Sequence, residues 1–248
     1  MTIASYFICA TPRSGSTLLC DLLKQSGVAG RPNSFYRAQS IGDYLRRWGV
    51  EPGEGLAFER RYLAAALREG TGGTGMFGMR LHGLSLFELL GRLAMLYPGE
   101  RTDAARLATA FGTPLYIRLR RRDKVAQAIS RVKAEQSGLW HRHADGGERE
   151  RVKPDEAPVY DSGKLGAVIA ETIEHEAMWD AWAAGQGIVP LDVSYEELSA
   201  DPARTLGMIL SALGRDPAIA AQVAVQTARL ADAVSVEWAA RYRAELSG

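Results

Sequence analysis

The chain has 248 residues, of which 46% are hydrophobic and 24% are charged, and its formal net charge at pH 7 is +1. This composition is typical of a soluble globular protein and excludes an intrinsically disordered chain. The near balance of 30 basic and 29 acidic residues lacks the global positive field of most nucleic-acid binders. We therefore expect no nucleic-acid partner, and any anion site must be local.

The two cysteines, Cys9 and Cys20, are too few for a disulfide framework and lack the C-x-x-C spacing of a zinc or redox site. This usage favours a reducing, cytoplasmic compartment. The first residues show no basic leader, and Arg92 interrupts the apolar run at residues 89–96 well short of the about 20 residues that span a bilayer. We expect neither a secretory signal nor a transmembrane segment.

The chain begins with the pattern of a strand, a polar loop and a helix. Residues 6–10 are a short apolar run of strand-forming types, which the breaker Pro12 ends. Leucines then recur at helical spacing over residues 18–23, and Gly27 supplies a C-terminal stop. The pattern predicts a buried strand that leads through a loop into a helix.

The next hundred residues alternate between amphipathic and apolar segments. Helices are predicted near residues 41–48, 56–67 and 103–111. The glycines at 72–75 predict a loop before a strand at 76–81, with a phosphate-cradling role as the weaker interpretation. Ser85 and Glu88 have the spacing of a capping box in front of an apolar helix that ends near Pro98.

The second half predicts two further strands, at residues 115–119 and 188–193. Asp123 is the expected N-cap of a helix through Val132. Later helices are predicted at 165–182 and from Asp201-Pro202 to Gly214. Residues 141–162 carry charges, prolines and glycines without periodicity, which indicates a polar surface excursion or a lid.

Four short apolar strands separated by helices predict an α/β fold with a mostly parallel central sheet flanked by helices. Residues 1–248 contain no convincing linker or internal repeat, so we expect a single domain. In such sheets ligands bind beyond the carboxyl ends of the strands.

The first candidate site is the loop Thr11-Pro12-Arg13-Ser14-Gly15-Ser16-Thr17 between the first strand and its helix. Backbone N–H groups, hydroxyls and the positive helix end suit a phosphate there, and Gly15 permits close backbone approach. Arg13 adds a fixed charge that can stabilise a phosphate leaving group. The alternative is an ordinary turn in which the hydroxyls only cap the helix. The Walker pattern is absent, which weakens an ATP-hydrolysing function.

The second candidate site follows the strand at 115–119. Arg122 precedes Ser130 by eight residues, or about two helical turns, so both can converge on one anion if the corner folds back. On its own the arginine run at 120–122 could equally be a solvated surface corner.

Together the two sites resemble the PAPS-dependent sulfotransferase superfamily, whose donor is 3′-phosphoadenosine 5′-phosphosulfate. More narrowly, the chain resembles the bacterial trehalose 2-sulfotransferase and LPS-sulfotransferase-like family. The matching residues are Arg13-Ser14-Gly15-Ser16-Thr17-Leu18-Leu19, Gly27-Val28-Ala29-Gly30, Arg122-Asp123 with Gln127-Ala128 and Ser130, Trp140, Asp192-Val193 with Tyr195, and Glu237-Trp238 with Arg241-Tyr242.

The resemblance implies a P-loop-like fold and assigns roles to these residues. Residues 11–17, including Arg13, Ser14, Gly15, Ser16 and Thr17, would bind the 5′-phosphosulfate. Arg122 and Ser130 would bind the 3′-phosphate, and Arg229 matches a family arginine that could reach the donor, or is a surface helix charge. No metal is required, and the relatives imply a homodimer.

The acceptor side departs from the family pattern. The family has a glutamate, proposed as general base, where Pro32-Asn33-Ser34-Phe35 places Ser34. A family lysine becomes Arg80, which keeps the charge but cannot serve as an acid. His82 follows Arg80 by two residues and would share its face of a strand. As an unperturbed histidine it could act as the base, whereas a structural role is its alternative. The base could instead be an acidic residue of the segment 31–60 or be supplied by the environment of the acceptor itself. His141 and His143 are interpreted as surface residues.

These observations predict in-line sulfuryl transfer from PAPS to a hydroxyl of a carbohydrate, a glycolipid or a small metabolite, with Arg13, Arg80 and His82 as catalytic residues. The alternatives are a P-loop-like kinase that uses ATP-Mg and a catalytically altered nucleotide-binding module.

Overall fold

The fold is described from a computed structural model of the chain, at residues 2–142, 145, 147–154, 156–225 and 232–247. The strands are β1 (Ser5–Ala10), β2 (Phe77–Leu81), β3 (Pro114–Arg120), β4 (Leu139–Arg142), β5 (Glu148–Arg151) and β6 (Leu191–Ser194). The α-helices are α1 (Ser16–Gln25), α2 (Ile41–Trp48), α3 (Gly55–Thr71), α4 (Gly83–Leu96), α5 (Asp103–Phe111), α6 (Lys124–Ser137), α7 (Ser162–Gly185), α8 (Tyr195–Ala200), α9 (Pro202–Ala212) and α10 (Ala233–Ser247). Two short 3₁₀ helices are η1 (Ala38–Ser40) and η2 (Pro217–Gln222).

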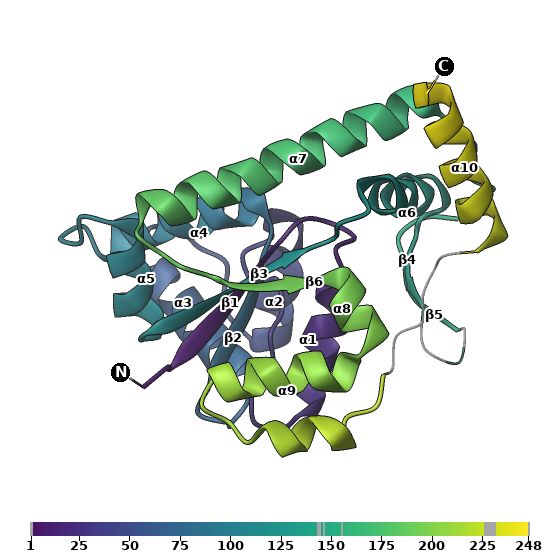
Figure 1. Ribbon diagram of the computed structural model, residues 1–248. Coiled ribbons are helices and arrows are strands. Elements are labelled where there is room, and N and C mark those ends of the chain that lie inside the picture. The colour runs from purple at the N-terminus through teal and green to yellow at the C-terminus, as the bar shows by residue number, and fades with distance from the viewer. Residues whose placement is uncertain (1, 143–144, 146, 155, 226–231, 248) are drawn as a thin grey trace.

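The central sheet has the order β2-β1-β3-β6, and all its neighbouring strands are parallel. β1 lies at the centre, with Ser5 opposite both Phe77 and Pro114 in the register. Helices cover both faces of this sheet, with α4, α5 and α7 on one side and α1 and α9 on the other (Figure 1). The predicted α/β architecture with a mostly parallel, helix-flanked sheet is confirmed.

The two faces of β1 explain this layering. Phe7 and Cys9 pack in a core with residues of α3, α4 and α5, while Tyr6, Ile8 and Ala10 pack with residues of α1 and α9. Every residue of β1 is buried. Because successive strand side chains point to opposite faces, a wholly apolar strand must be covered on both. A third core joins α6, α7 and α10 around Trp238.

Several predicted boundaries differ from the structure. The helix expected to begin with a Ser85–Glu88 capping box begins earlier, at Gly83, with His82 as N-cap; Ser85 is buried inside it. The strand predicted from residue 188 begins at Leu191, because Pro190 has no N–H to donate to the ladder with β3. The capping box lies instead at Ser194 and Glu197, on α8.

The pattern-free segment 141–162 contains more structure than its sequence indicates. Part of it pairs as the antiparallel strands β4 and β5. This hairpin is anchored to the end of α6, where Arg151 donates to the Ser137 carbonyl at 2.7 Å and Val152 N–H donates to the Gly138 carbonyl at 2.9 Å. Tertiary contacts of this kind leave no periodic signal. Residues 143–144, 146 and 155 lie outside the described residues.

Candidate active site

The loop between β1 and α1 is held in shape by contacts from α6. Gln127, which is almost fully buried, donates through Nε2 to Thr11 Oγ1 at 2.9 Å and to the Pro12 carbonyl at 2.8 Å. Ser14 Oγ donates to the Thr11 carbonyl at 2.8 Å, so its hydroxyl closes the loop rather than facing a ligand. Arg13 has a φ of 64°, in the left-handed region that non-glycine residues rarely adopt. Such strain is typical of functional sites.

The N-terminus of α1 is open to a ligand. Gly15 precedes the helix with a φ of 89°, and among the described residues no side chain caps this end. The first-turn amides of a helix have no intrahelical acceptor, and together with the helix dipole they attract anions. Gly15 is also packed against Tyr195, since a Cβ at this position would lie 2.5 Å from Tyr195 Cδ2. Only glycine satisfies both the backbone conformation and this close approach.

Arg13 joins the two sites that the sequence predicted. Its Nε donates to Ser130 Oγ on α6 at 3.0 Å, across 117 residues of chain, and its Nη1 donates to the Trp140 carbonyl at 2.5 Å. Burial, together with the nearby Arg121, lowers the pKa of Arg13 to about 10. The guanidinium is therefore still protonated at pH 7. A fixed positive charge lies between the first loop and the second predicted site.

Arg80 connects the same loop to the acceptor-side residues. Its Nε donates to Ser34 Oγ at 2.7 Å, and its Nη1 donates to Thr17 Oγ1 at 2.9 Å and reaches Ser16 Oγ at 3.5 Å. Thr17 Oγ1 is also 3.2 Å from His141 Nε2. Within the described part of the chain, Arg80 is bonded to hydroxyls and forms no ion pair with a carboxylate, so its charge is available to an anion.

His141 was predicted to be a surface residue, and the structure corrects this interpretation. The imidazole is partly buried against Thr17 because the β4–β5 hairpin brings it to the N-terminus of α1. The contact joins residues 124 positions apart, so no local pattern could indicate it.

His82 lies beside Arg80 at the start of α4. Its Nε2 is buried and has no hydrogen-bond partner among the described residues. Burial, followed by the positive charge of Arg80, lowers the pKa of His82 to about 3. The near-neutral pKa expected from the sequence is therefore wrong for the unliganded protein. The ring is neutral at pH 7 and a weak proton acceptor.

One cavity of about 1,320 Å³ contains most of the predicted site residues. Of the predicted set, its lining includes Arg13, Gly15, Ser16, Thr17, Arg80, His82 and Ser130. Ser14 and Arg122 do not line it, and Arg229 lies outside the described residues. Two motifs far apart in the sequence thus meet in one cavity, at the carboxyl ends of β1 and β3.

The spacing of Arg122 and Ser130 predicted that both side chains would converge on one anion, but Ser130 lines the cavity and Arg122 does not. Its side chain is exposed and pairs with Glu197, with Nη2 2.6 Å from Oε1. The backbone amides of Arg122 and Asp123 both donate to the Glu196 carboxylate, which fixes the turn between β3 and α6. Convergence with Ser130 would require the turn to direct the Arg122 side chain back along α6. The bonds to Glu196 and Glu197 direct this side chain toward α8 instead.

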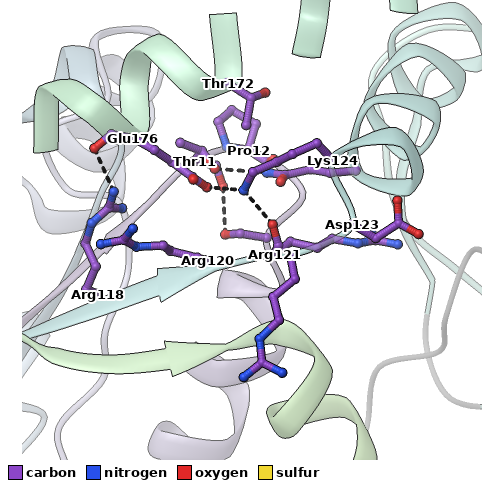
Figure 2. Close-up of polar contacts among 12 residues, drawn as sticks. Thr11, Pro12, Arg118, Arg120, Arg121, Asp123, Lys124, Thr172 and Glu176 are labelled. Atoms are coloured by element: carbon purple, nitrogen blue, oxygen red, sulfur yellow. Dashed lines mark hydrogen bonds and ion pairs between the residues drawn. The ribbon is translucent and has the colours of Figure 1, made fainter. Parts of the chain in front are cut away.

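Arg121 lines the cavity instead. Its guanidinium carbon lies 4.6 Å from the centroid of the Tyr195 ring, a cation–π contact that places the charge beside Gly15. In Figure 2 the Arg121 side chain extends away from Lys124 and Glu176, toward the opposite side of β3. Arg121 and Tyr195 are functional candidates to which the sequence analysis assigned no role, although Tyr195 is among the residues that match the family. A sequence signal for both exists: Arg121 directly follows β3 and Tyr195 directly follows β6, and the carboxyl ends of these two parallel strands are neighbours.

A buried polar cluster behind the cavity positions this turn (Figure 2). Lys124 Nζ donates to the Arg121 carbonyl at 2.5 Å and to Glu176 Oε1 at 2.6 Å. Arg118, which is 2% exposed, donates to the Glu176 carbonyl at 2.7 Å. The cluster links the end of β3 to α7, so the backbone at Arg121 is held from both sides of the sheet edge.

No group of three or more His, Cys, Asp or Glu side chains in the described part of the chain is placed to hold a metal ion. None of the helices described there combines the length and apolar character needed to cross a bilayer.

The strand-loop-helix unit of β1 and α1 opens at the carboxyl ends of a parallel sheet into a cavity lined by Arg13, Arg80 and Arg121, which defines a P-loop-like α/β protein. The family model of the Stf0 sulphotransferases matches residues 5–245, so the chain belongs to the Stf0 sulfotransferase family.

Two curated relatives cover nearly the whole chain. The trehalose 2-sulfotransferase of Mycobacterium tuberculosis (strain ATCC 35801 / TMC 107 / Erdman) is 31% identical over 264 residues, covering 98% of this chain and 96% of the relative. The trehalose 2-sulfotransferase of Mycolicibacterium smegmatis (strain ATCC 700084 / mc(2)155) is 29% identical, covering 96% and 94%. Among solved structures, the sulfotransferase domain of the Synechococcus PCC 7002 olefin synthase is 16% identical with a TM-score of 0.42, covering 98% of this chain and 95% of that one.

Proposed function

We propose that this sulfotransferase uses PAPS as its donor and transfers the sulfuryl group to a hydroxyl of a carbohydrate, a glycolipid or a small metabolite. The observation that carries the proposal is the contact of Arg13 with Ser130, which unites the phosphate-binding loop and α6 in one cavity. The two trehalose 2-sulfotransferases to which the chain is similar support a carbohydrate-like acceptor.

The residues present fit such a donor. The uncapped N-terminus of α1, with Ser16 and Thr17, suits the 5′-phosphosulfate. Ser130 and the cavity-lining Arg121 suit a second phosphate, and the Tyr195 ring suits stacking with a base. Arg122, assigned to the 3′-phosphate by family resemblance, would have to leave Glu197 to take part. Arg229 remains a proposed donor contact by resemblance alone.

The chemistry is a displacement at sulfur. PAPS would supply the sulfuryl group and leave as adenosine 3′,5′-bisphosphate, while the acceptor oxygen forms the new S–O bond and loses its proton. Arg13 and Arg80 would hold the transferring group and stabilise charge on the leaving oxygen. We assign proton acceptance to neutral His82, whose pKa a bound anion beside Arg80 would raise by offsetting the positive charge there. Ser34 would orient Arg80, to which it is bonded.

The proposal also includes a homodimer in a cytoplasmic compartment. The two cysteines support a reducing environment, because both are buried and neither forms a disulfide. Sedimentation of the purified chain would test the oligomeric state.

The donor is tested by ligand-dependent thermal stability. Adenosine 3′,5′-bisphosphate at a hundredfold excess over its Kd should stabilise the chain by about 2.7 kcal/mol, whereas ATP-Mg should not. Arg13→Ala should abolish the shift. Arg46→Ala should keep it, since Arg46 is an exposed arginine that pairs with Asp43 on α2, outside the cavity lining.

The reaction is tested by following labelled sulfate from PAPS to a panel of hydroxyl acceptors. Stabilisation by ATP-Mg alone would indicate the kinase. Bisphosphate binding without transfer to any acceptor would indicate the altered nucleotide-binding module.

A further inference from the structure

Two large apolar side chains are exposed at the rim of the reaction cavity. Leu84 is 78% exposed and Phe87 is 52% exposed, and both belong to the cavity lining. They are three residues apart on α4, so they lie on the same face of the helix. Scattered exposed apolar residues are ordinary, but a pair inside a binding cavity indicates what the cavity binds.

Leu84 and Phe87 follow His82, a proposed reacting group, by two and five residues. His82 is the N-cap of α4 and Arg80 precedes it by two residues, so this wall of the cavity changes from cationic and hydroxyl groups to apolar ones within a few residues. An acceptor whose hydroxyl reaches Arg80 and His82 would lie close to this first turn of α4, because all four residues line the same cavity. A wholly polar acceptor would leave Leu84 and Phe87 in contact with water or with hydroxyls, and would gain nothing from them.

The charged groups of the same cavity restrict the polar part of the acceptor. Of the carboxylates that line the cavity, Glu88 is paired with Arg92, and Glu135 and Glu171 are paired with Arg131. Asp232 is paired with Lys133, and Glu150 Oε2 lies 3.5 Å from His141 Nε2. Four of these carboxylates are thus balanced by an arginine or a lysine, whereas Arg80, beside the proposed reacting group, is bonded to hydroxyls and to no carboxylate among the described residues. The head of the acceptor should therefore be uncharged or anionic.

We propose that the acceptor is an amphiphile: its uncharged or anionic, hydroxyl-bearing head reaches Arg80 and His82, and its alkyl or acyl chain lies on Leu84 and Phe87. The inference rests on the proposed function for the reaction of the head, but the binding of the chain can be measured without it. Among the acceptor classes proposed above, it favours a glycolipid over a free sugar.

The alternative occupant of this surface is a protein, either a helix of a partner or a second copy of the chain. Met95 distinguishes a docked protein from an alkyl chain. Met95 lies on the same face of α4 and is 49% exposed, but it is not part of the cavity lining. It is eight residues beyond Phe87, or about 12 Å along the helix. A docked protein would bury all three side chains, whereas an alkyl chain that enters the cavity would use only Leu84 and Phe87.

The test uses octyl β-D-glucoside, below the concentration at which it forms micelles, and glucose as the matched head group. Calorimetric titration of the full chain should show octyl glucoside binding at least tenfold more tightly than glucose. The double variant Leu84→Ser/Phe87→Ser should bind octyl glucoside about tenfold more weakly than the parent chain, whereas Met95→Ser should bind it with unchanged affinity. Because all three side chains are exposed, the variants should keep the melting temperature of the parent. Octyltrimethylammonium should bind more weakly than octyl glucoside.

Equal affinities for glucose and octyl glucoside would overturn the proposal, as would an equal loss of affinity in Met95→Ser. A dimer that Leu84→Ser/Phe87→Ser converts to monomers in sedimentation would also overturn it, because the pair would then be an interface. The same variants are titrated with adenosine 3′,5′-bisphosphate, whose affinity should not change. A parent chain that binds octyl glucoside as expected but not the bisphosphate would refute the proposed donor and leave this inference standing.

Discussion

At the scale of single residues, the site depends on which arginines remain available to a ligand. Arg13 and Arg80 are bonded to hydroxyls and a carbonyl, whereas Arg122 forms an exposed ion pair with Glu197. Arg121 lines the cavity on the Tyr195 ring. Neighbouring arginines in one turn therefore have different surroundings.

This difference predicts the effect of two adjacent substitutions. Arg121→Ala should weaken binding of adenosine 3′,5′-bisphosphate by about 10- to 100-fold, the range expected when a charged hydrogen bond to phosphate is lost. Arg122→Ala should change it less than threefold, since this guanidinium is exposed and outside the cavity lining. Calorimetric titration of both variants decides the matter. A larger loss in Arg122→Ala would restore the assignment made from its spacing to Ser130.

His82 predicts a pH dependence of stability. Its pKa in the folded, unliganded protein is lowered to about 3, below its unfolded value near 6.5. Between these values the unfolded chain binds a proton at His82 that the folded chain does not bind, which favours unfolding. The free energy of unfolding is therefore highest, as far as His82 is concerned, above pH 6.5, and it falls as the pH is lowered toward 3. Urea unfolding from pH 7 to pH 4 should show a steeper loss for the parent than for His82→Asn. Parallel curves for the two proteins would show that His82 titrates normally.

At the scale of elements, the strand-loop-helix unit works because other elements hold its loop. α6 contributes Gln127 to the loop backbone and Ser130 to Arg13, and α8 contributes Tyr195 against Gly15. The unit is therefore a joint product of β1, α1, α6 and α8. Its shape should be sensitive to packing as well as to backbone conformation.

Gly15 and Gly27 separate these two effects. Both have positive φ, at 89° and 70°, but a Cβ on Gly15 would collide with Tyr195, whereas around Gly27 nothing lies within 4 Å. Both alanine substitutions should lower the free energy of unfolding by about 1 kcal/mol or more through backbone strain. Gly15→Ala should lose a further 1–3 kcal/mol through overpacking. Urea unfolding measures this additional loss, which should be smaller when Gly15→Ala is combined with Tyr195→Ala. Equal losses of free energy in Gly15→Ala and Gly27→Ala would contradict the packing argument.

At the scale of the whole molecule, the cavity is assembled by segments from most of the chain. Arg13 contacts α6 and the strand β4, Arg80 contacts α1 and Ser34, and β4 contacts α1 through His141. The β4–β5 hairpin thus lies on the same two residues, Arg13 and Thr17, that the proposed donor would engage. Donor binding and the hairpin should be coupled through them.

Hydrogen exchange tests this coupling. Adenosine 3′,5′-bisphosphate should slow amide exchange at residues 13–18, and also at residues 139–142 of β4, because the hairpin contacts the binding loop directly. Helix α2, which does not line the cavity, serves as the internal reference. Protection confined to α1 would show that the hairpin is independent of the donor site.

The sequence alone determined the architecture, the position of the loop at 11–17 between the first strand and its helix, and the family. These features have local signals: a buried strand is apolar throughout, an N-cap such as Asp123 precedes its helix, and the loop motif is contiguous. The strands β1 and β3 and the ends of α1 and α9 were accordingly predicted to within one or two residues.

Only the tertiary structure decided which arginine of 120–122 enters the cavity, how far the pKa of His82 falls, and that His141 reaches Thr17. Each of these depends on contacts between residues distant in the chain. The direction of Arg122 is set by Glu196 and Glu197, more than seventy residues away, and the pKa of His82 is set by burial under neighbouring elements. Side-chain direction at a turn and desolvation are properties of the packed chain, so no spacing rule could supply them.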